Sequence, residues 1–542
     1  MKHEAVALTG KAPGNAPRSH RADATYDALV IGAGFGGLGA ALALAEAGAS
    51  VCVCESLRYP GGCASTFTRG GARFDAGATL VSGLAKGQLF GDWLARYSPS
   101  TVVDWMDPLV ELRTRDFSLS ITRDRESLVH SFLAIPGAPA RAIRDFFDFQ
   151  RKIAASLWEL FDDPTLLPPF GLETIARHAG RALRYLPLLP LLGTSLGEVL
   201  ASHGLADFRP LRTYVDALCQ ITVQCSADEA EATFALAAMD YYYRGTGHVR
   251  GGVGALASAL VSACEQAGTE VLLSNRVTAL RREADGSWLA TTRRGEVRAR
   301  AIVANLLPSA LASMLEPERH ARAIVELRSR SAPIEKAWGA AMLYAVARPP
   351  EGEPDDAHHL ELVNDASAPF SEGNHVFVSI SSALETERAP KGRRVLTMST
   401  HVPLAKLARL GEGTSVYVAE VQDAMRATVA ARAPEWHAGL ERVITASPRT
   451  FARFVGRPAG AVGGLPRRVG LASYTSLGPS SPLDDVWLVG DSVFPGQSAL
   501  ATAIGGVRTA TAITRRLGSF RAAALPPTEA DAPAPEAETG GG

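Results

Sequence analysis

Apolar and polar positions follow a regular order near the start of the chain. An apolar run at 28–31 precedes a glycine-rich turn, an alanine- and leucine-rich stretch over 37–47, Gly48, and a second mainly apolar run over 50–54. Short unbroken apolar runs are typical of strands buried in a parallel sheet. An Ala/Leu-rich stretch that ends at a glycine is typical of a helix. The pattern therefore predicts a strand–helix–strand unit.

The turn inside this unit has the glycine order G-x-G-x-x-G, at Gly32, Gly34 and Gly37. There the first glycine permits a tight turn, the second lets a pyrophosphate approach the backbone, and the third lets the helix pack against the strand. The helix N-terminus adds unpaired N–H groups and a partial positive charge. A purely structural glycine turn is the alternative. The position between strand and helix favours a dinucleotide site formed by Gly32, Ala33, Gly34, Phe35, Gly36 and Gly37.

Glu55 ends the second strand, eighteen residues after Gly37. An acidic side chain there accepts hydrogen bonds from the ribose 2′-OH of an adenosine and repels a 2′-phosphate. A second glycine-rich segment, from Gly245, has no apolar strand directly before it. We therefore predict one tightly bound dinucleotide, and an external electron acceptor such as a quinone or oxygen.

Two further segments favour FAD over NAD. Gly61 and Gly62 precede Cys63, and the alternating residues over 66–68 and 73–75 predict a short hairpin, where a simple NAD dehydrogenase usually begins another helix. We interpret the paired glycines and Cys63 as a turn beside a flavin.

The second segment lies over 400 residues later and repeats the strand–turn–helix order. An apolar strand over 486–489 precedes Gly490 and Asp491, and a helix is predicted from Ser498 and Ala499. The Asp491 carboxylate can accept a hydrogen bond from a ribityl hydroxyl, and the helix start can face the negative end of a reduced flavin ring. A helix cap is an alternative role for Asp491 and is compatible with the first.

Composition excludes several classes of function. The 542 residues are enough for at least two domains, and 55 Lys and Arg against 56 Asp and Glu give no basic face for nucleic acid. The six cysteines form no CxxC pair, and neither they nor the histidines have zinc-ligand spacing, so no metal site is predicted. Cys52 and Cys54 are expected to be buried thiols in a reducing, cytoplasmic setting. The ends, 1–24 and 519–542, are predicted to be disordered.

These segments resemble the FAD-dependent carotenoid oxidoreductases, the group of phytoene desaturases, carotenoid 3,4-desaturases, carotenoid cis–trans isomerases and retinol saturases. The resemblance spans about 25–518 and is carried by 30–37, Glu55, 60–64, 74–77 and 489–497. It implies that the backbone around Val277 meets the adenine. Many phytoene desaturases have Arg where this chain has Cys63, so the 3,4-desaturase and isomerase branches look closer. A covalent link from Cys63 to the flavin is an alternative.

The implied fold is α/β: a Rossmann-like FAD-binding domain with a parallel sheet and a βαβ unit, interleaved with a mixed-sheet plus helical substrate domain. The FAD domain is expected from 25–115, 245–310 and 470–518, and the substrate and membrane-contact domain from 116–244 and 311–469. Within the middle piece, strands at 270–273 and 287–292 are expected to flank a turn at Asp285 and Gly286, with a buried strand at 301–304.

The implied activity is oxidoreduction of a carotenoid or related polyisoprenoid. It takes the form of desaturation by hydride transfer to flavin N5, or of flavin-dependent cis–trans isomerisation; no side chain is assigned to catalysis. One alternative is a flavin amine oxidase-like enzyme with a polar substrate and an aromatic cage. Another is a flavoprotein that binds FAD and a partner without turnover.

Two segments bear on an apolar substrate. Arg177, Arg181 and Arg184 recur at helical spacing before a leucine-rich stretch broken by Pro187 and Pro190. This pattern predicts a monotopic membrane contact, with a core helix pair and a solvated basic face as the alternative. The protein is thus expected to be peripherally associated with a membrane. Three consecutive tyrosines, 241–243, are expected on a strand, where they line a tunnel or fill the core.

Overall fold

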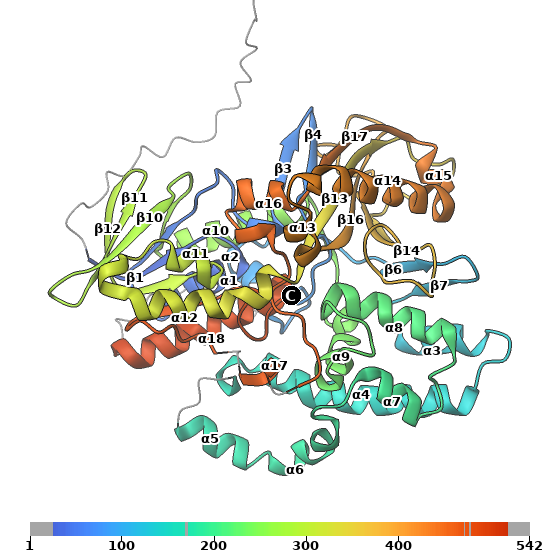
Figure 1. Ribbon diagram of the computed structural model, residues 1–542, viewed down its shortest axis with the longest axis horizontal. Coiled ribbons are helices and arrows are strands. Elements are labelled where there is room, and N and C mark those ends of the chain that lie inside the picture. The colour runs from blue at the N-terminus through green and yellow to red at the C-terminus, as the bar shows by residue number, and fades with distance from the viewer. Residues whose placement is uncertain (1–24, 168–171, 471, 476–477, 519–542) are drawn as a thin grey trace, which may run out of the picture.

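The computed structural model describes residues 25–167, 172–470, 472–475 and 478–518. The predicted disordered ends, 1–24 and 519–542, lie outside these residues. Two seven-stranded sheets stand side by side, and a layer of helices lies below them (Figure 1).

The first sheet contains the predicted strand–helix–strand unit. Its strand order is β10-β11-β12-β1-β2-β9, and β18 pairs with the end of β12. β1 is parallel to both β2 and β12. The bounds are β1 (Thr25–Ile31), β2 (Val51–Cys54), β9 (Glu270–Leu272), β10 (Val277–Arg282), β11 (Trp288–Thr292), β12 (Gly295–Ala304) and β18 (Val486–Leu488). The parallel sheet and βαβ unit expected from the sequence are confirmed.

One predicted pairing in this sheet is wrong. The strand expected at 270–273 does not flank the turn at Asp285 and Gly286; as β9 it lies parallel to β2, at the sheet edge. The hairpin partner of β11 is β10, which directly precedes the turn. β10 is harder to predict than β9, because several of its side chains are exposed and polar and its sequence lacks an apolar run.

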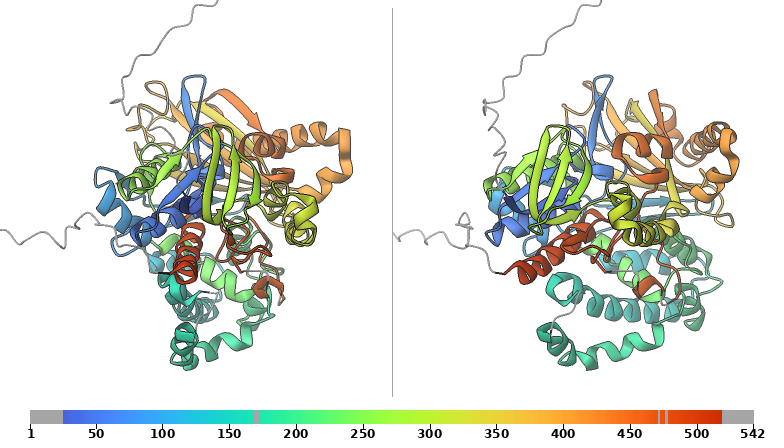
Figure 2. Two further views of the ribbon diagram at one scale, coloured as in Figure 1. Left: turned by 90° about the vertical axis from the view of Figure 1, so that its left-hand side faces the viewer. Right: turned by 60° about the vertical axis from the view of Figure 1, so that its left-hand side comes forward.

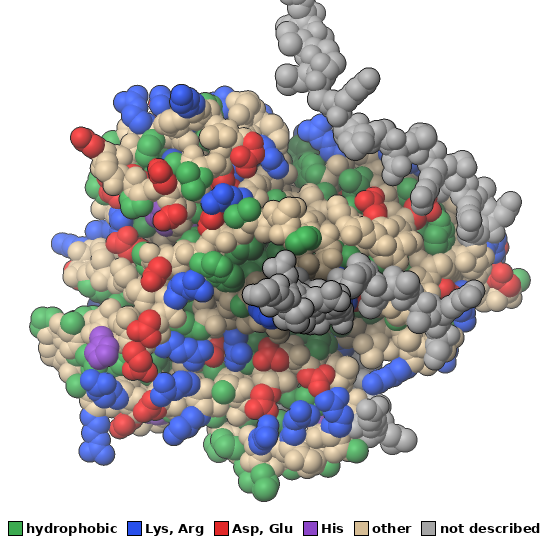
Figure 3. Space-filling model, turned by 180° about the vertical axis from the view of Figure 1, so that it is seen from behind, with side chains coloured by type: hydrophobic (Ala, Val, Ile, Leu, Met, Phe, Trp, Pro, Cys, Tyr) green, Lys and Arg blue, Asp and Glu red, His purple; other side chains and the backbone are tan. Residues whose placement is uncertain are grey.

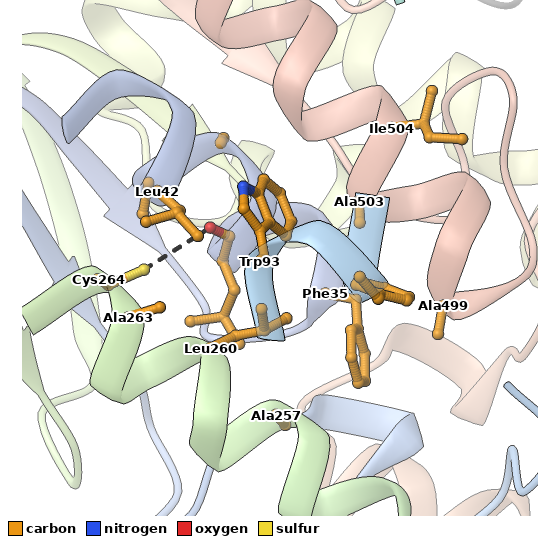
Figure 4. Packing of buried hydrophobic residues seen from close by; sticks show 14 of the residues in the cluster. Phe35, Leu42, Trp93, Ala257, Leu260, Ala263, Cys264, Ala499, Ala503 and Ile504 are labelled. Carbon is orange, nitrogen blue, oxygen red and sulfur yellow. Dashed lines mark hydrogen bonds between the residues drawn. The ribbon is translucent and has the colours of Figure 1, made fainter. Parts of the chain in front are cut away.

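Tightly packed helices cover one face of this sheet: α1 (Phe35–Glu46), α2 (Leu89–Tyr97), α10 (Val253–Gln266) and α18 (Ala499–Leu517). Figure 4 shows Trp93 of α2 between Leu42 and Leu260 on one side and Ala503 on the other, all in one apolar cluster. A Cβ on Gly39 of α1 would lie only 2.6 Å from the carbonyl oxygen of Ala503 on α18. The small residues of α1 thus allow the two ends of the chain to pack backbone against backbone.

The opposite face is covered by α11 (Pro308–Ala312) and α12 (Pro317–Glu335). Cys52 and Cys54 are buried free thiols in this layer, as predicted. Ile324 and Leu327 of α12 pack in the same apolar cluster as the first sheet. The predicted substrate domain, which starts at 311, thus begins with a helix that packs on the first sheet.

The second sheet has the order β17-β13-β16-β15-β14-β6-β7. Its strands are β6 (Val110–Arg113), β7 (Ser118–Ile121), β13 (Trp338–Ala347), β14 (His358–Val363), β15 (His375–Ile380), β16 (Arg394–Pro403) and β17 (Leu440–Ala446). β6 pairs parallel with β14 and antiparallel with β7, so the predicted boundary at 115 cuts a hairpin that belongs to this sheet. α13 (Leu404–Leu410), α14 (Thr414–Arg432) and α15 (Pro434–His437) lie over the sheet, and α16 (Pro448–Val455) follows β17.

Smaller elements connect the two sheets. The predicted hairpin is present as β3 (Thr66–Arg69) and β4 (Ala72–Asp75), and a two-residue pair joins β5 (Val103–Asp104) to β8 (His248–Val249). The short helix α17 (Ala472–Thr475) lies ahead of β18.

The helical layer lies below both sheets in two further views (Figure 2). It contains α3 (Arg125–Leu133), α4 (Ala140–Asp162), α5 (Leu172–Ala179), α6 (Ala182–Tyr185), α7 (Leu196–Ser202), α8 (Arg209–Thr222) and α9 (Ala232–Ala238). The chain is broken after α6 by a 3₁₀ turn over 186–191, as its prolines predict. The tyrosines at 241–243 form a 3₁₀ turn and not a strand, because i+3 hydrogen bonds continue from the end of α9.

Candidate active site

The two remote glycine turns meet in space, as the sequence predicts. A Cβ on Gly36 would lie 2.9 Å from the backbone nitrogen of Gly490. Asn305, the residue after β12, stands beside this junction, and its Nδ2 donates to the carbonyl of Gly32 at 3.3 Å. Sequence analysis did not identify Asn305. It could have been recognised as the first polar residue after a buried strand, since the ends of parallel strands meet at the ligand-binding edge of such a sheet.

The third glycine acts through packing. A Cβ on Gly37 would lie 2.1 Å from the carbonyl oxygen of Gly32 and 3.1 Å from Val30 Cγ1, so only glycine lets α1 approach β1 here. Gly37 and Ala33 are not among the residues that line the cavity described below. Ala33 contributes its backbone N–H, which donates to Glu55 Oε2 at 2.7 Å.

Glu55 is buried directly after β2, and its carboxylate accepts hydrogen bonds from residues close to it in the structure. Oε1 accepts from the Leu57 N–H at 2.8 Å and from the Ser56 hydroxyl at 3.1 Å. A carboxylate oxygen can accept two hydrogen bonds, so Oε2 retains acceptor capacity after bonding Ala33. Glu55 also lines the cavity, which is the position that a ribose hydroxyl requires.

A cavity of about 440 Å³ runs along both turns. The predicted cofactor residues on its wall are Gly32, Gly34, Phe35, Gly36, Glu55, Gly61, Gly62, Cys63, Gly490, Asp491, Ser498 and Ala499. Val277 does not line it: this residue is buried in β10 and pairs with Thr292 of β11. The proposed role of Val277 at the adenine stays a prediction.

Asp491 has a partner that the sequence did not reveal. Its carboxylate pairs with the guanidinium of Arg457, with a shortest N–O distance of 2.9 Å. The pKa of Arg457 is raised, because the attraction of Asp491 outweighs the effect of burial. The cap of α18 is Ser498, whose hydroxyl accepts from the Ala501 N–H at 3.0 Å, so Asp491 is not the helix cap.

Cys63 lies on the cavity wall in a 3₁₀ turn over 62–64. Burial raises the pKa of its thiol to about 11, although the charge of Arg457 opposes the shift. A thiol that stays protonated at neutral pH is a weak nucleophile. This environment argues against a covalent bond from Cys63 to the cofactor.

Away from the glycine turns a large part of the cavity wall is apolar. The apolar side chains come from the second sheet, from the helical layer and from α16 and the loop after it: Trp158, Phe161, Ile221, Val223, Phe234, Met342, Phe377, Phe451, Val455 and Val462. Carboxylates among the cavity-lining residues are those of Glu55 and Asp491. His401 also faces the cavity, and burial lowers its pKa to about 3, so its ring is neutral at pH 7.

Unpaired polar atoms on the wall indicate a ligand. Arg467 Nη1, Gln224 Oε1 and Gln497 Oε1 are buried without a hydrogen-bond partner in the described part of the chain, and all three residues line the cavity. Buried polar atoms are nearly always hydrogen-bonded. A glycine cradle, an acid at its end and unsatisfied donors and acceptors along the wall together fit a polar dinucleotide joined to an apolar partner.

The family model described as "Flavin containing amine oxidoreductase" matches residues 35–339. The chain belongs to this family. It is accordingly an FAD-dependent oxidoreductase. The glycine cradle and Glu55 remain the predicted FAD site of this flavin-containing amine oxidoreductase.

Similar proteins place this family member near the carotenoid oxidoreductases, which confirms the resemblance noted in the sequence. Prolycopene isomerase of Arabidopsis thaliana is 26% identical over 517 residues, covering 92% of this chain and 84% of that protein. Phytoene desaturase (neurosporene-forming) of Cereibacter sphaeroides is 31% identical over 172 residues, 28% of this chain and 32% of that protein. A solved oxidoreductase from Methanosarcina mazei shares the fold, with a TM-score of 0.58 at 17% identity over 89% of this chain and 99% of that one.

Proposed function

We propose that this enzyme acts on a carotenoid or related polyene, either desaturating it or changing its double-bond geometry. The observation that carries the proposal is one continuous cavity with the FAD cradle along one part and an apolar, aromatic wall along the rest. When bound, FAD supplies a two-electron acceptor for a C–H bond or, in reduced form, a donor for rearrangement without net oxidation. Relatives named for a carotenoid isomerase and a desaturase support this substrate class.

The residues of the wall position such a substrate and keep it dry. Trp158 and Phe161 come from α4, Phe234 from α9, and Phe377 from β15, so the wall closes around the substrate from two layers. Apolar rings gain free energy by burying a polyene, and they offer it no group that forms hydrogen bonds. A water-excluded wall also protects charge that develops during the reaction.

An amine substrate is less compatible with this wall. A protonated amine needs a carboxylate or an electron-rich cage to compensate its charge. Glu55 and Asp491 are already bonded, Asp491 to Arg457, and a second guanidinium, that of Arg467, lines the same cavity. The charge of Arg467, which has no ion-pair partner among the described residues, repels an ammonium group.

The assay that tests the proposal compares the two substrate classes on one preparation. Holoenzyme, oxidised or reduced, is incubated without oxygen with a poly-cis or partly saturated carotenoid in liposomes, and separately with primary amines. We expect chromatography to show a new carotenoid geometry or a new double bond, while the amines are recovered unchanged. Amine oxidation with recovery of the carotenoid would overturn the assignment.

We also propose that a leucine ridge, formed by Leu183, Leu186, Leu189 and Leu192, contacts a membrane surface. These side chains are between 45% and 82% exposed, whereas Leu188 and Leu191 between them are buried. Leu183 lies in α6, which is at the lower edge of the molecule in Figure 1. Hydrophobic side chains protrude beside basic ones at the lower edge in Figure 3. Among the described residues no helix is both long and apolar enough to span a bilayer. Exposed leucines next to arginines suit an anionic lipid interface.

Replacing Leu183 and Leu189 with serine is expected to lower the fraction of protein that floats with anionic liposomes several-fold. Stability is expected to change by only about 0.5 kcal/mol, because both side chains are exposed. Leu384→Ser is the matched control, since Leu384 is 53% exposed on another part of the molecule. Equal flotation of the double variant and the control would count against the ridge as the contact.

A further inference from the structure

Apart from Glu55, the charged side chains that line the cavity do not cancel. They are two guanidinium groups, those of Arg457 and Arg467, and one carboxylate, that of Asp491. Asp491 is bound to Arg457 through both guanidinium Nη atoms, at 3.2 Å to Oδ1. Arg467 is left without an ion-pair partner among the described residues, and one positive charge remains uncompensated.

Arg467 is held rigidly in this position. Its backbone N–H donates to the Val223 carbonyl at 3.0 Å, and its carbonyl accepts from the Glu231 N–H at 2.9 Å, which fixes it to the helical layer. Its guanidinium carbon lies 5.5 Å from the ring centroid of Phe234. Nη2 donates to the Pro495 carbonyl at 3.4 Å, while Nη1 has no partner.

The loop ahead of α18 is shaped around this side chain. A Cβ on Gly496 would lie 2.6 Å from Arg467 Nη2, so glycine is the residue that leaves room for the guanidinium. Ser498, two residues further on, caps α18. The partial positive charge of the helix N-terminus and the full charge of Arg467 therefore both face the cavity beside this loop.

A buried cation without a partner is costly, and it persists where a ligand supplies the opposite charge. Burial lowers the pKa of Arg467 to about 10, so the group is still charged at neutral pH. With the adenine ribose at Glu55 and the pyrophosphate at the glycine turn, Arg467 and the start of α18 would be the residues of the same cavity that face the flavin ring. A flavin that accepted a hydride would gain two electrons and one proton, so its reduced form would carry one negative charge for Arg467 to compensate.

We propose that Arg467 is a tuning residue that holds the negative charge of the reduced flavin and so raises the reduction potential of the bound FAD. The proposal rests on FAD as the cofactor and not on the identity of the substrate. An enzyme that abstracts hydride and one that works with reduced FAD both gain from a cofactor that is easily reduced.

The test measures the midpoint potential of the bound FAD by equilibration with reference dyes, which requires no turnover. In R467M we expect the ratio of reduced to oxidised FAD at a fixed potential to fall at least about tenfold, which is about 30 mV for a two-electron couple. R467K keeps the charge and is expected to retain most of the potential. R468Q is the matched control, because Arg468 is half-exposed and pairs with Glu229 at 3.2 Å.

A second variant predicts a change of opposite sign. In Asp491→Asn the charge of Arg457 is released, so the potential is expected to rise. The potential of Asp491→Asn can be measured even if R467M does not fold. An unchanged potential in R467M with FAD bound would overturn the proposal, and so would a fall in D491N. Carotenoid turnover is not part of either readout, so failure of the proposed substrate leaves this test intact.

Discussion

Replacing Gly34 with valine is expected to remove FAD from the protein while the apoprotein stays folded. Gly34 lines the cavity, and a Cβ there would lie 2.6 Å from Asn305 Nδ2, the end of a side chain that can turn aside. The added methyl groups then occupy the space in which a pyrophosphate approaches the backbone. We expect FAD per chain in the purified protein to fall at least about tenfold. The amount of FAD extracted from the protein measures the loss of cofactor, and a circular dichroism spectrum shows whether the apoprotein is folded.

Two companion variants sharpen the interpretation. Gly413→Val is the control, because a Cβ on Gly413 would meet only Leu410 Cβ, at an ordinary 4.0 Å. Asn305→Ala in the Gly34→Val background removes the contact with Asn305 but leaves the methyl groups in place. If that double variant recovered FAD, the loss would come from displacing Asn305 and not from blocking the cradle.

The second large effect is expected at Asp75, which ties three segments together. Its carboxylate accepts from the Thr66 hydroxyl at 2.6 Å, the Val253 N–H at 3.1 Å and Arg388 Nη2 at 2.8 Å. Asp75 and Arg388 are both at most 4% exposed. Among the described residues, Asp75→Ala leaves Arg388 with one ion-pair partner, Glu385 at 3.7 Å, and a hydrogen bond to the Arg73 carbonyl at 3.4 Å. The free energy of unfolding is expected to fall by about 3–5 kcal/mol, the usual consequence of leaving a buried charge without its partner.

Denaturant unfolding of a double-mutant cycle measures this effect. Adding Arg388→Met to Asp75→Ala removes the stranded charge, so we expect the double variant to regain much of the lost stability. Glu326→Ala is the control: the Glu326–Arg330 pair is exposed, and such pairs contribute at most about 1 kcal/mol. If the double variant were no more stable than Asp75→Ala, the unpaired charge of Arg388 would not be the cause of the lost stability.

The sequence was most informative where backbone geometry has a local signature. Strand, glycine turn, helix and Glu55 all lie within thirty-one residues, so their spacing alone predicted the dinucleotide cradle. The distant turn at Gly490 was predictable because it repeats the same order. Its partner Arg457 was not, since nothing in the chain order shows which arginine is folded against Asp491.

The remaining differences have a common physical origin in tertiary packing. Asn305 and Arg467 acquire their roles from distant neighbours, Gly32 for Asn305 and Val223 and Phe234 for Arg467. Aromatic residues favour strands, which predicts a strand at the three tyrosines over 241–243. The i+3 hydrogen bonds that continue from the preceding helix hold them in a 3₁₀ turn instead. The strand at 270–272 lies beside β2, where a local pattern cannot distinguish a sheet edge from a hairpin.

The central claim is that two turns from opposite ends of the chain hold one FAD, with Glu55 at its adenosine. The most direct measurement is the visible spectrum of the purified protein, followed by release and identification of the cofactor with acid. We predict the spectrum of an oxidised flavin and one FAD per chain, released without a covalent bond to Cys63. A folded protein that is colourless, and that takes up no FAD when it is supplied, would contradict the account.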